Sequence, residues 1–191
     1  MIMSMFKITM ITNRKLSENK LINQIDKVLN SYHIDRIILR EKDLSEDEYY
    51  YLAKETISKC NEYNVECVLH KYVNVAHKLN YKKIHLSVND AKANKDKLKY
   101  FNCLGMSIHS IGQLKEAESL GATYVNAGHI FETDCKKGLP GRGINFLNDI
   151  CQNSSIPVYA IGGINENNIN LIKSTSAAGA CIMSGFMKIN N

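Results

Sequence analysis

The chain has 191 residues, of which 45% are hydrophobic and 23% are charged, so it carries enough apolar material for one well-buried core. Its formal net charge of +5 comes from 24 basic and 19 acidic side chains dispersed along the chain, without the basic blocks or interleaved aromatic residues of nucleic-acid-binding proteins. We therefore expect a single domain over residues 1–191 and a small anionic ligand, with no nucleic acid as a partner.

No apolar run reaches the length that crosses a membrane, and the first five residues lack the basic segment and the cleavage site of a secretory signal. The six cysteines contain no C-x-x-C pair, which argues against structural zinc or a disulfide framework. We expect a cytoplasmic protein without a membrane partner.

Eight short runs rich in β-branched and other apolar residues predict eight strands. In chain order they cover residues 6–12, 36–39, 66–69, 83–86, 104–108, 123–127, 157–161 and 180–183. Between them lie segments with apolar residues at helical spacing, such as 21–29 and 51–60. Each run is apolar at nearly every position, so both faces of the sheet must be covered, as in a doubly wound sheet or a closed barrel. Eight repeated units favour a compact (β/α)8 TIM barrel.

The length of the chain restricts this barrel. Because a (β/α)8 barrel usually takes about 250 residues, the helices must be minimal. Few residues follow the eighth predicted strand, so we expect the eighth outer helix to be truncated or missing. A bare apolar groove between the first and last strands would invite a second subunit, which predicts a homo-oligomer.

Glycine is distributed unevenly. All eleven glycines lie at or after Gly105. Gly162 and Gly163 follow the seventh predicted strand, and Ser184 and Gly185 follow the eighth. In (β/α)8 barrels these two loops commonly hold phosphate, because glycine lets backbone N–H groups approach an oxyanion. We predict a phosphate-binding site from these four residues; the alternative is that the glycines only end strands at turns.

The loop after the sixth predicted strand begins at Gly128 and carries His129. Carboxyl ends of barrel strands carry the chemistry in such enzymes, and an imidazole exchanges protons near neutral pH. Glu132, Asp134 and Lys136 would crowd the same loop with charge. We predict that His129 is catalytic, although a hydrogen-bonded loop histidine is the simpler interpretation.

Polar residues follow three other strands. Arg40 and Lys42 belong to a charged run after the second strand, which is either a binding group for carboxylate or phosphate or a solvated surface segment. Ser107 lies on the fifth strand near its end, and Ser110 is placed to cap the next helix. His70 and His85 lie at strand ends where they would line the site, whereas His33 and His77 fall in predicted helical segments at the surface.

These residues together carry a resemblance. Over residues 6–185 the chain resembles the family that contains thiamine phosphate synthase and the thiazole tautomerase of the TenI type, which share a (β/α)8 barrel. The segments that carry the resemblance are residues 39–43, 85–86, 105–110, 128–138, 160–164 and 183–185.

The synthase branch joins a pyrimidine diphosphate to a thiazole phosphate with Mg²⁺, using an Asn-Asp pair after the third strand and a further aspartate after the fourth. Here the pair is His70-Lys71, while Asp90 matches the second aspartate. Mg²⁺ needs oxygen ligands, so an ammonium in place of a carboxylate adds repulsion. The resemblance thus implies that diphosphate chemistry is impaired or absent, and that Asp90 is a metal ligand only if the synthase interpretation holds.

The segment that starts at Gly128-His129 is similar to the tautomerase branch, where synthases usually have Gly-Pro. That branch aromatises a thiazole carboxylate phosphate by moving one proton, without a metal or redox cofactor. The resemblance implies that His129 transfers the proton. It also implies substrate contacts from Arg40, Lys42, Ser107, Thr133 and Lys136.

Three alternatives stay open at this stage. One is a working thiamine phosphate synthase with altered metal ligands, and the second is a non-catalytic regulator that binds a thiazole phosphate. The third is an unrelated phosphosugar isomerase, since fold alone does not fix chemistry. The sequence leaves open the oligomer size and whether Lys71 occupies the space of a metal.

Overall fold

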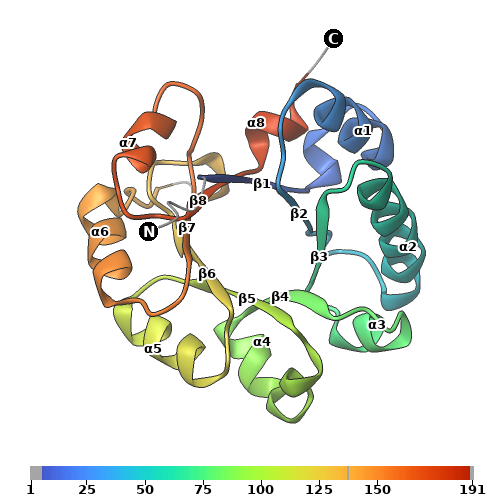
Figure 1. Ribbon diagram of the computed structural model, residues 1–191. Helices are drawn as coiled ribbons and strands as arrows, with labels where there is room; N and C mark the ends of the chain where they lie inside the picture. Colours follow the sequence, from blue (N-terminus) through green and yellow to red (C-terminus); the bar gives the residue numbers. More distant parts are fainter. Residues whose placement is uncertain (1–5, 137, 190–191) are drawn as a thin grey trace.

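The computed structural model describes residues 6–136 and 138–189, and its strands form a closed parallel barrel in which β8 pairs with β1 (Figure 1). The strands are β1 Lys7–Ile11, β2 Arg36–Leu39, β3 Glu66–His70, β4 Lys83–Ser87, β5 Cys103–Ile108, β6 Tyr124–Gly128, β7 Val158–Ile161 and β8 Gly179–Ile182. The predicted (β/α)8 barrel is confirmed, and the apolar runs of the sequence fell within one residue of these bounds.

Helices surround the barrel in Figure 1, most of them short. They are α1 Leu21–Ser31, α2 Glu46–Glu62, α3 Val73–Lys78, α4 Val88–Ala93, α5 Ile111–Ser119, α6 Gly143–Asn153, α7 Ile169–Lys173 and α8 Ser184–Met187, with 3-10 turns η1 Arg14–Leu16, η2 Lys95–Tyr100 and η3 Asp134–Lys136. Four of the eight α-helices have six residues or fewer, which is how 191 residues suffice for a barrel. Among the described residues, no helix combines the length and apolarity that crossing a membrane requires.

Several helices begin at serine caps that lie at or just after the carboxyl ends of the strands. Ser110 accepts a hydrogen bond from the Gln113 amide at the start of α5, as the sequence predicted. Ser87 caps α4 in the same way, accepting from the Asp90 amide. His33, predicted within a helix, instead lies in the loop that follows α1, because α1 ends at Ser31.

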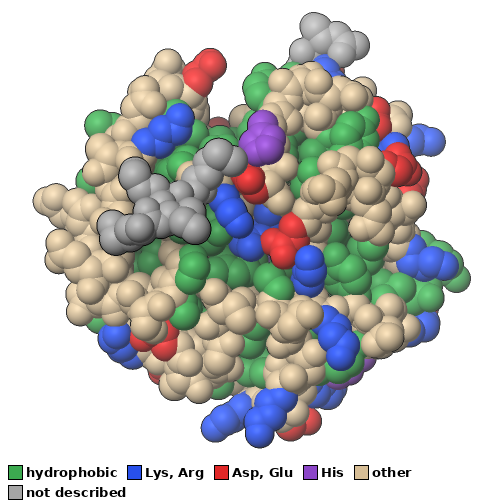
Figure 2. Space-filling view, viewed as in Figure 1, with side chains coloured by type: hydrophobic (Ala, Val, Ile, Leu, Met, Phe, Trp, Pro, Cys, Tyr) green, Lys and Arg blue, Asp and Glu red, His purple; other side chains and the backbone are tan. Residues whose placement is uncertain are grey.

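Ion pairs close the amino-terminal end of the barrel. Arg36, Glu66 and Lys83 start three neighbouring strands, and the Glu66 carboxylate pairs with both cations. The Arg36 guanidinium also stacks 4.2 Å from the centre of the Tyr124 ring inside the barrel. In the view of Figure 2, acidic and basic side chains gather side by side near the middle of the face.

The short helix α8 follows β8 directly and lies beside α1 (Figure 1). Its Phe186 and Met187 side chains are buried in the main hydrophobic core. The buried Gln24 side chain of α1 donates a hydrogen bond of 2.7 Å to the Phe186 carbonyl. The eighth helix is thus truncated as predicted, but the expectation of a bare groove was wrong, since two apolar side chains pack there. The homo-oligomer stays a prediction.

Candidate active site

The carboxyl ends of all eight strands surround a cavity of about 500 Å³. Of the residues predicted from the sequence, it is lined by Arg40, Lys42, Asp90, Ser107, His129, Thr133, Lys136, Gly162, Gly163 and Ser184. Gly185 lines the neighbouring cavity. The structure therefore brings the predicted site residues together at one mouth, although the role of each stays a prediction.

The charged side chains of the loop after β2 lie in two different places. The Glu41 carboxylate is buried, 1% exposed, and accepts hydrogen bonds from the Thr12 hydroxyl at 2.7 Å and from the Arg14 amide at 3.0 Å. The Arg40 amide donates to the same Thr12 hydroxyl at 2.9 Å. With Glu41 fixed against the loop after β1, Arg40 and Lys42 on either side of it line the cavity. The interpretation of this run as a solvated surface segment is wrong for Glu41.

The loops after β3 and β4 contribute one further cation and one carboxylate. Lys71 lies at the rim in the left-handed backbone region, with φ of 72°, and its amide donates to the His85 carbonyl. Asp90 accepts a hydrogen bond of 2.6 Å from the Ser87 hydroxyl. It is the one carboxylate among the described residues that line this cavity.

The mouth has an excess of positive charge. Arg40, Lys42, Lys71 and Lys136 all line it. Desolvation lowers the pKa of the Lys42 ammonium, and repulsion from the other three cations lowers it further against the attraction of Asp90. Such an arrangement is stabilised by a ligand that brings more than one negative charge.

His129 sits in a loop that is tied down on several sides. The carbonyl of Gly128 accepts a hydrogen bond of 2.7 Å from His109 Nδ1, and the Gly128–His129 peptide bond is cis. The Arg142 amide donates to the His129 carbonyl at 3.0 Å, and the His129 ring nitrogen Nε2 lies 3.3 Å from the Leu139 carbonyl. The imidazole is half-buried and lines the cavity, as a proton-transfer group requires.

The loops after β6 and β7 touch backbone to backbone. The Ile130 amide donates to the Ile161 carbonyl at 2.9 Å. Gly162 has φ of +106°, and a Cβ there would lie 2.4 Å from the His129 Cβ. A Cβ on Gly163 would lie 2.3 Å from the Glu132 carbonyl oxygen. Both glycines are therefore required by the close approach of the two loops, whether or not they also bind phosphate.

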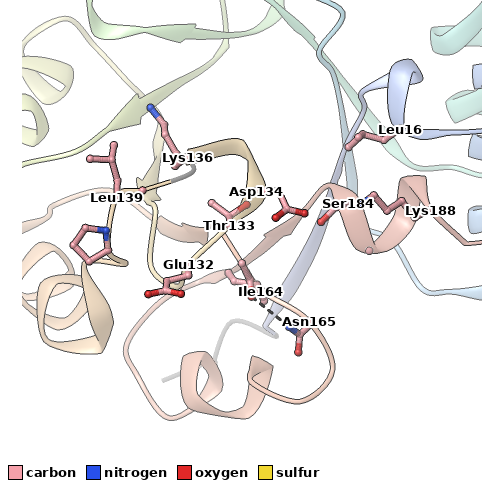
Figure 3. Close-up of a pocket in the computed structure, with 14 residues that line it drawn as sticks. Leu16, Glu132, Thr133, Asp134, Lys136, Leu139, Ile164, Asn165, Ser184 and Lys188 are labelled. Atoms are coloured by element: carbon pink, nitrogen blue, oxygen red, sulfur yellow. Dashed lines mark hydrogen bonds between the residues drawn. The ribbon is translucent and has the colours of Figure 1, made fainter.

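A second cavity of about 760 Å³ lies between these loops and α8. Figure 3 shows Thr133 and Asp134 on one side of it, and Ser184 of α8 and Lys188, the residue after α8, on the other. It shares Thr133, Lys136, Gly163, Ile164 and Ser184 with the first cavity. Of the predicted phosphate residues, Gly163 and Ser184 line both cavities, Gly162 lines the first and Gly185 lines the second. Lys137 belongs to the same loop in the sequence but lies outside the described residues.

Two neutral histidines lie beneath the mouth. The rings of His70 and His85 stack with centroids 5.9 Å apart. Burial, with smaller effects of Arg36 and Lys42, lowers the pKa of His85 to about 3. Burial also holds the pKa of His70 well below its usual value. His85 Nε2 lies 2.8 Å from the Ser107 hydroxyl and Nδ1 lies 3.1 Å from the Tyr124 hydroxyl. His70 lines the cavity as predicted, whereas His85 does not reach it.

Three polar side chains that line the cavity were missing from the predicted set, namely those of Ser87, His109 and Asn126. Asn126 carried a usable signal, since it is a polar residue inside an otherwise apolar strand. His109 follows β5 and holds the Gly128 carbonyl, so it positions the loop that carries His129.

Among the described residues that line the mouth, Asp90 offers the one carboxylate that could bind Mg²⁺. Mg²⁺ prefers about six oxygen ligands, several of them water, and is held through one or two carboxylates together with ligand phosphates. The Asp90 carboxylate accepts a hydrogen bond from Ser87, and four cations line the same cavity. Across the described residues, no group of three or more His, Cys, Asp and Glu side chains is arranged to hold a metal ion.

The closed barrel, with a cationic cavity at the carboxyl ends of its strands, has the architecture of the (β/α)8 enzymes. The family model TMP-TENI, described as thiamine monophosphate synthase, matches residues 8–186, and the chain belongs to this family. It is thus an enzyme of thiamine biosynthesis.

Named relatives agree with the family. The chain is 35% identical over 153 residues to the thiamine-phosphate synthase of Clostridium tetani, covering 76% of this chain and 71% of the relative. It is 30% identical over 190 residues to that of Clostridium acetobutylicum, covering 95% and 87%. The thiamine phosphate pyrophosphorylase of Pyrococcus furiosus superposes with a TM-score of 0.85 at 27% identity, covering 97% of this chain and 89% of that one. The resemblance to the family is confirmed, while these names do not single out the TenI branch.

Proposed function

We propose that the protein is a thiazole tautomerase, which aromatises a thiazole carboxylate phosphate by acid–base proton transfer. The observation that carries this proposal is a half-buried imidazole, His129, at a mouth rich in cations, where the described residues include one carboxylate, Asp90. The resemblance of the segment that starts at Gly128-His129 to the tautomerase branch supports the same choice. A positioned acid–base group is typically worth about 10² to 10⁴ in rate.

The cavity supports a division of roles. The substrate phosphate binds the backbone at Gly162, Gly163, Ser184 and Gly185, at the junction of the two cavities. Arg40 or Lys136 holds the carboxylate, because both are cations at the rim. His129 removes the ring proton and returns a proton to the exocyclic carbon, so that the reaction neither gains nor loses atoms.

The remaining predicted residues line the same space. Lys42 adds positive charge at the carboxylate end, while Ser107 and Thr133 offer hydroxyl groups along the wall. Lys71, where the synthase branch has an aspartate, adds a further cation toward an anionic substrate. The reaction needs neither a metal nor a redox cofactor.

The second candidate is thiamine phosphate synthase, which joins hydroxymethylpyrimidine diphosphate to thiazole phosphate with Mg²⁺. The relatives quoted above carry that name, and Asp90 and the cations of the rim suit a diphosphate as well as a carboxylate. Lys71 and the lack of a second carboxylate beside Asp90 among the described lining residues speak against it.

One experiment decides between the two. The purified protein is given the non-aromatic thiazole carboxylate phosphate, with EDTA or with Mg²⁺, and aromatisation is followed by its ultraviolet absorbance. In parallel it is given pyrimidine diphosphate, thiazole phosphate and Mg²⁺, and thiamine phosphate is measured. We expect aromatisation at equal rates with and without metal. Thiamine phosphate formation without aromatisation would establish the synthase instead, and tight binding without either reaction would indicate a regulator.

A further inference from the structure

Asn126 is a buried amide at the floor of the first cavity. It lies on β6, two residues before Gly128, and is 1% exposed while still lining the cavity. Two strand residues correspond to roughly 7 Å, so Asn126 lies well below the rim. Within the described part of the chain, neither its Nδ2 nor its Oδ1 has a hydrogen-bond partner.

A buried amide without a partner destabilises the unliganded fold, because both polar atoms lose their hydrogen bonds to water. The neighbour on β5 does not relieve it, since the Ser107 hydroxyl lies 2.8 Å from His85 Nε2. An apolar residue at this strand position would avoid the cost. The amide is therefore best explained by a partner that enters the cavity.

The surroundings of Asn126 define what that partner is. Ile11, Ile161 and Cys181 line the cavity from β1, β7 and β8 and form an apolar wall. The cations stand at the rim, on the loops after β2, β3 and β6. A ligand that satisfies both parts has its anionic groups at the rim and a flat, uncharged, mostly apolar end with a hydrogen-bonding atom at the floor.

We propose that Asn126 determines ligand specificity by donating a hydrogen bond from Nδ2 to the ring nitrogen of an azole packed against the wall of Ile11, Ile161 and Cys181. This inference rests on the part of the proposed function that places a thiazole phosphate in the cavity. It does not depend on which reaction follows, because the tautomerase and the synthase both bind such a ring.

The test uses two ligands that differ at one ring atom. Thiazole phosphate carries the ring nitrogen, and its thiophene analogue has CH in that place. Dissociation constants for both are measured by calorimetry with the full chain. We expect the protein to bind the thiazole about tenfold more tightly, the size of one net hydrogen bond.

Two variants assign this preference to the amide. Asn126→Leu removes both polar atoms at similar size, and Asn126→Asp keeps the shape but replaces the donor with an acceptor. Both should bind thiazole and thiophene equally. In the unliganded protein, Asn126→Leu should also raise Tm by about 2–4 °C, because it removes an unpaired polar group.

A structural amide gives the opposite results. A fall in Tm for Asn126→Leu would mean that the side chain supports the fold, and would overturn the proposal. So would equal affinity of the parent protein for both ligands, a preference that survives in both variants, or failure to bind thiazole phosphate. If the preference is present but no aromatisation occurs, Asn126 keeps its role and only the assigned reaction is wrong.

Discussion

The two walls of the active-site cavity are built from different material. On the side of β2 and β3, charge comes from the long side chains of Arg40, Lys42 and Lys71. On the side of β6 and β7, the loops after these strands form the wall with their backbone, at glycines whose Cβ positions are already filled by neighbouring atoms. One side of the cavity therefore consists of flexible, charged side chains, and the other side consists of rigid main chain.

This difference predicts how each wall responds to change. A flexible cation contributes to ligand affinity through charge that solvent and salt screen, so its loss is graded. A glycine in contact with another loop has no room for adjustment, so its substitution moves the loop. The side-chain wall should therefore tune binding, while the main-chain wall should fix the position of the catalytic group.

We expect the largest effect on kcat from substitution of His129, whose loop is part of the main-chain wall. His129→Ala should lower kcat for aromatisation about 10²- to 10⁴-fold, because the proton-transfer group is lost. The affinity for thiazole phosphate should stay nearly the same, since the proposed phosphate site at Gly162, Gly163, Ser184 and Gly185 does not include His129. Steady-state kinetics and calorimetry give the two numbers.

His33→Ala is the matched control for this variant. His33 lies in the loop after α1, with 78% of its side chain exposed, and does not line the cavity. Its substitution should leave kcat unchanged. Equal turnover by His129→Ala and the parent protein would remove His129 from the mechanism.

The next effect concerns the rigid wall itself. Gly162→Ala should lower the free energy of unfolding by about 2 kcal/mol or more, through a strained backbone and a Cβ 2.4 Å from the Cβ of His129. It should also lower kcat, since His129 must move. Urea unfolding and the aromatisation assay measure the two losses.

Gly121→Ala separates the cost of a strained backbone from the cost of a close Cβ contact. Gly121 has φ of +84°, but a Cβ there would meet no atom within 4 Å. It should cost about 1 kcal/mol from the backbone alone and leave kcat unchanged. If both variants lose the same stability and keep full activity, the two loops are not rigidly coupled.

The sequence predicted the barrel well for a physical reason. Strands covered on both faces are apolar at nearly every position, so the first and last residues of each strand can be predicted from the local sequence alone. The groups after the strands were found for a similar reason, because parallel strands end at one edge. His129, Arg40 and Gly162 could be placed at the mouth from their positions alone.

Other features depend on contacts that local sequence does not contain. Glu41 turns away from the cavity because Thr12 and Arg14 bind its carboxylate from another loop. The groove beside α8 is filled because Gln24, which is far away in the sequence, donates a hydrogen bond to the Phe186 carbonyl. Asn126 shows its unpaired amide only when all the neighbouring strands are in place. Such contacts can be identified only from the three-dimensional structure.

The smallest effect is expected on the side-chain wall, at Lys71. Lys71→Ala should weaken thiazole phosphate binding about fivefold at low salt, the size of one exposed charge near an anion. The loss should shrink as salt rises, because the site is open to solvent. Lys95→Ala, in η2 and outside the cavity lining, is the matched control and should bind as the parent does. A salt-independent loss, or a loss as large as that caused by Gly162→Ala, would mean that Lys71 supports the structure and that the two walls are not distinct.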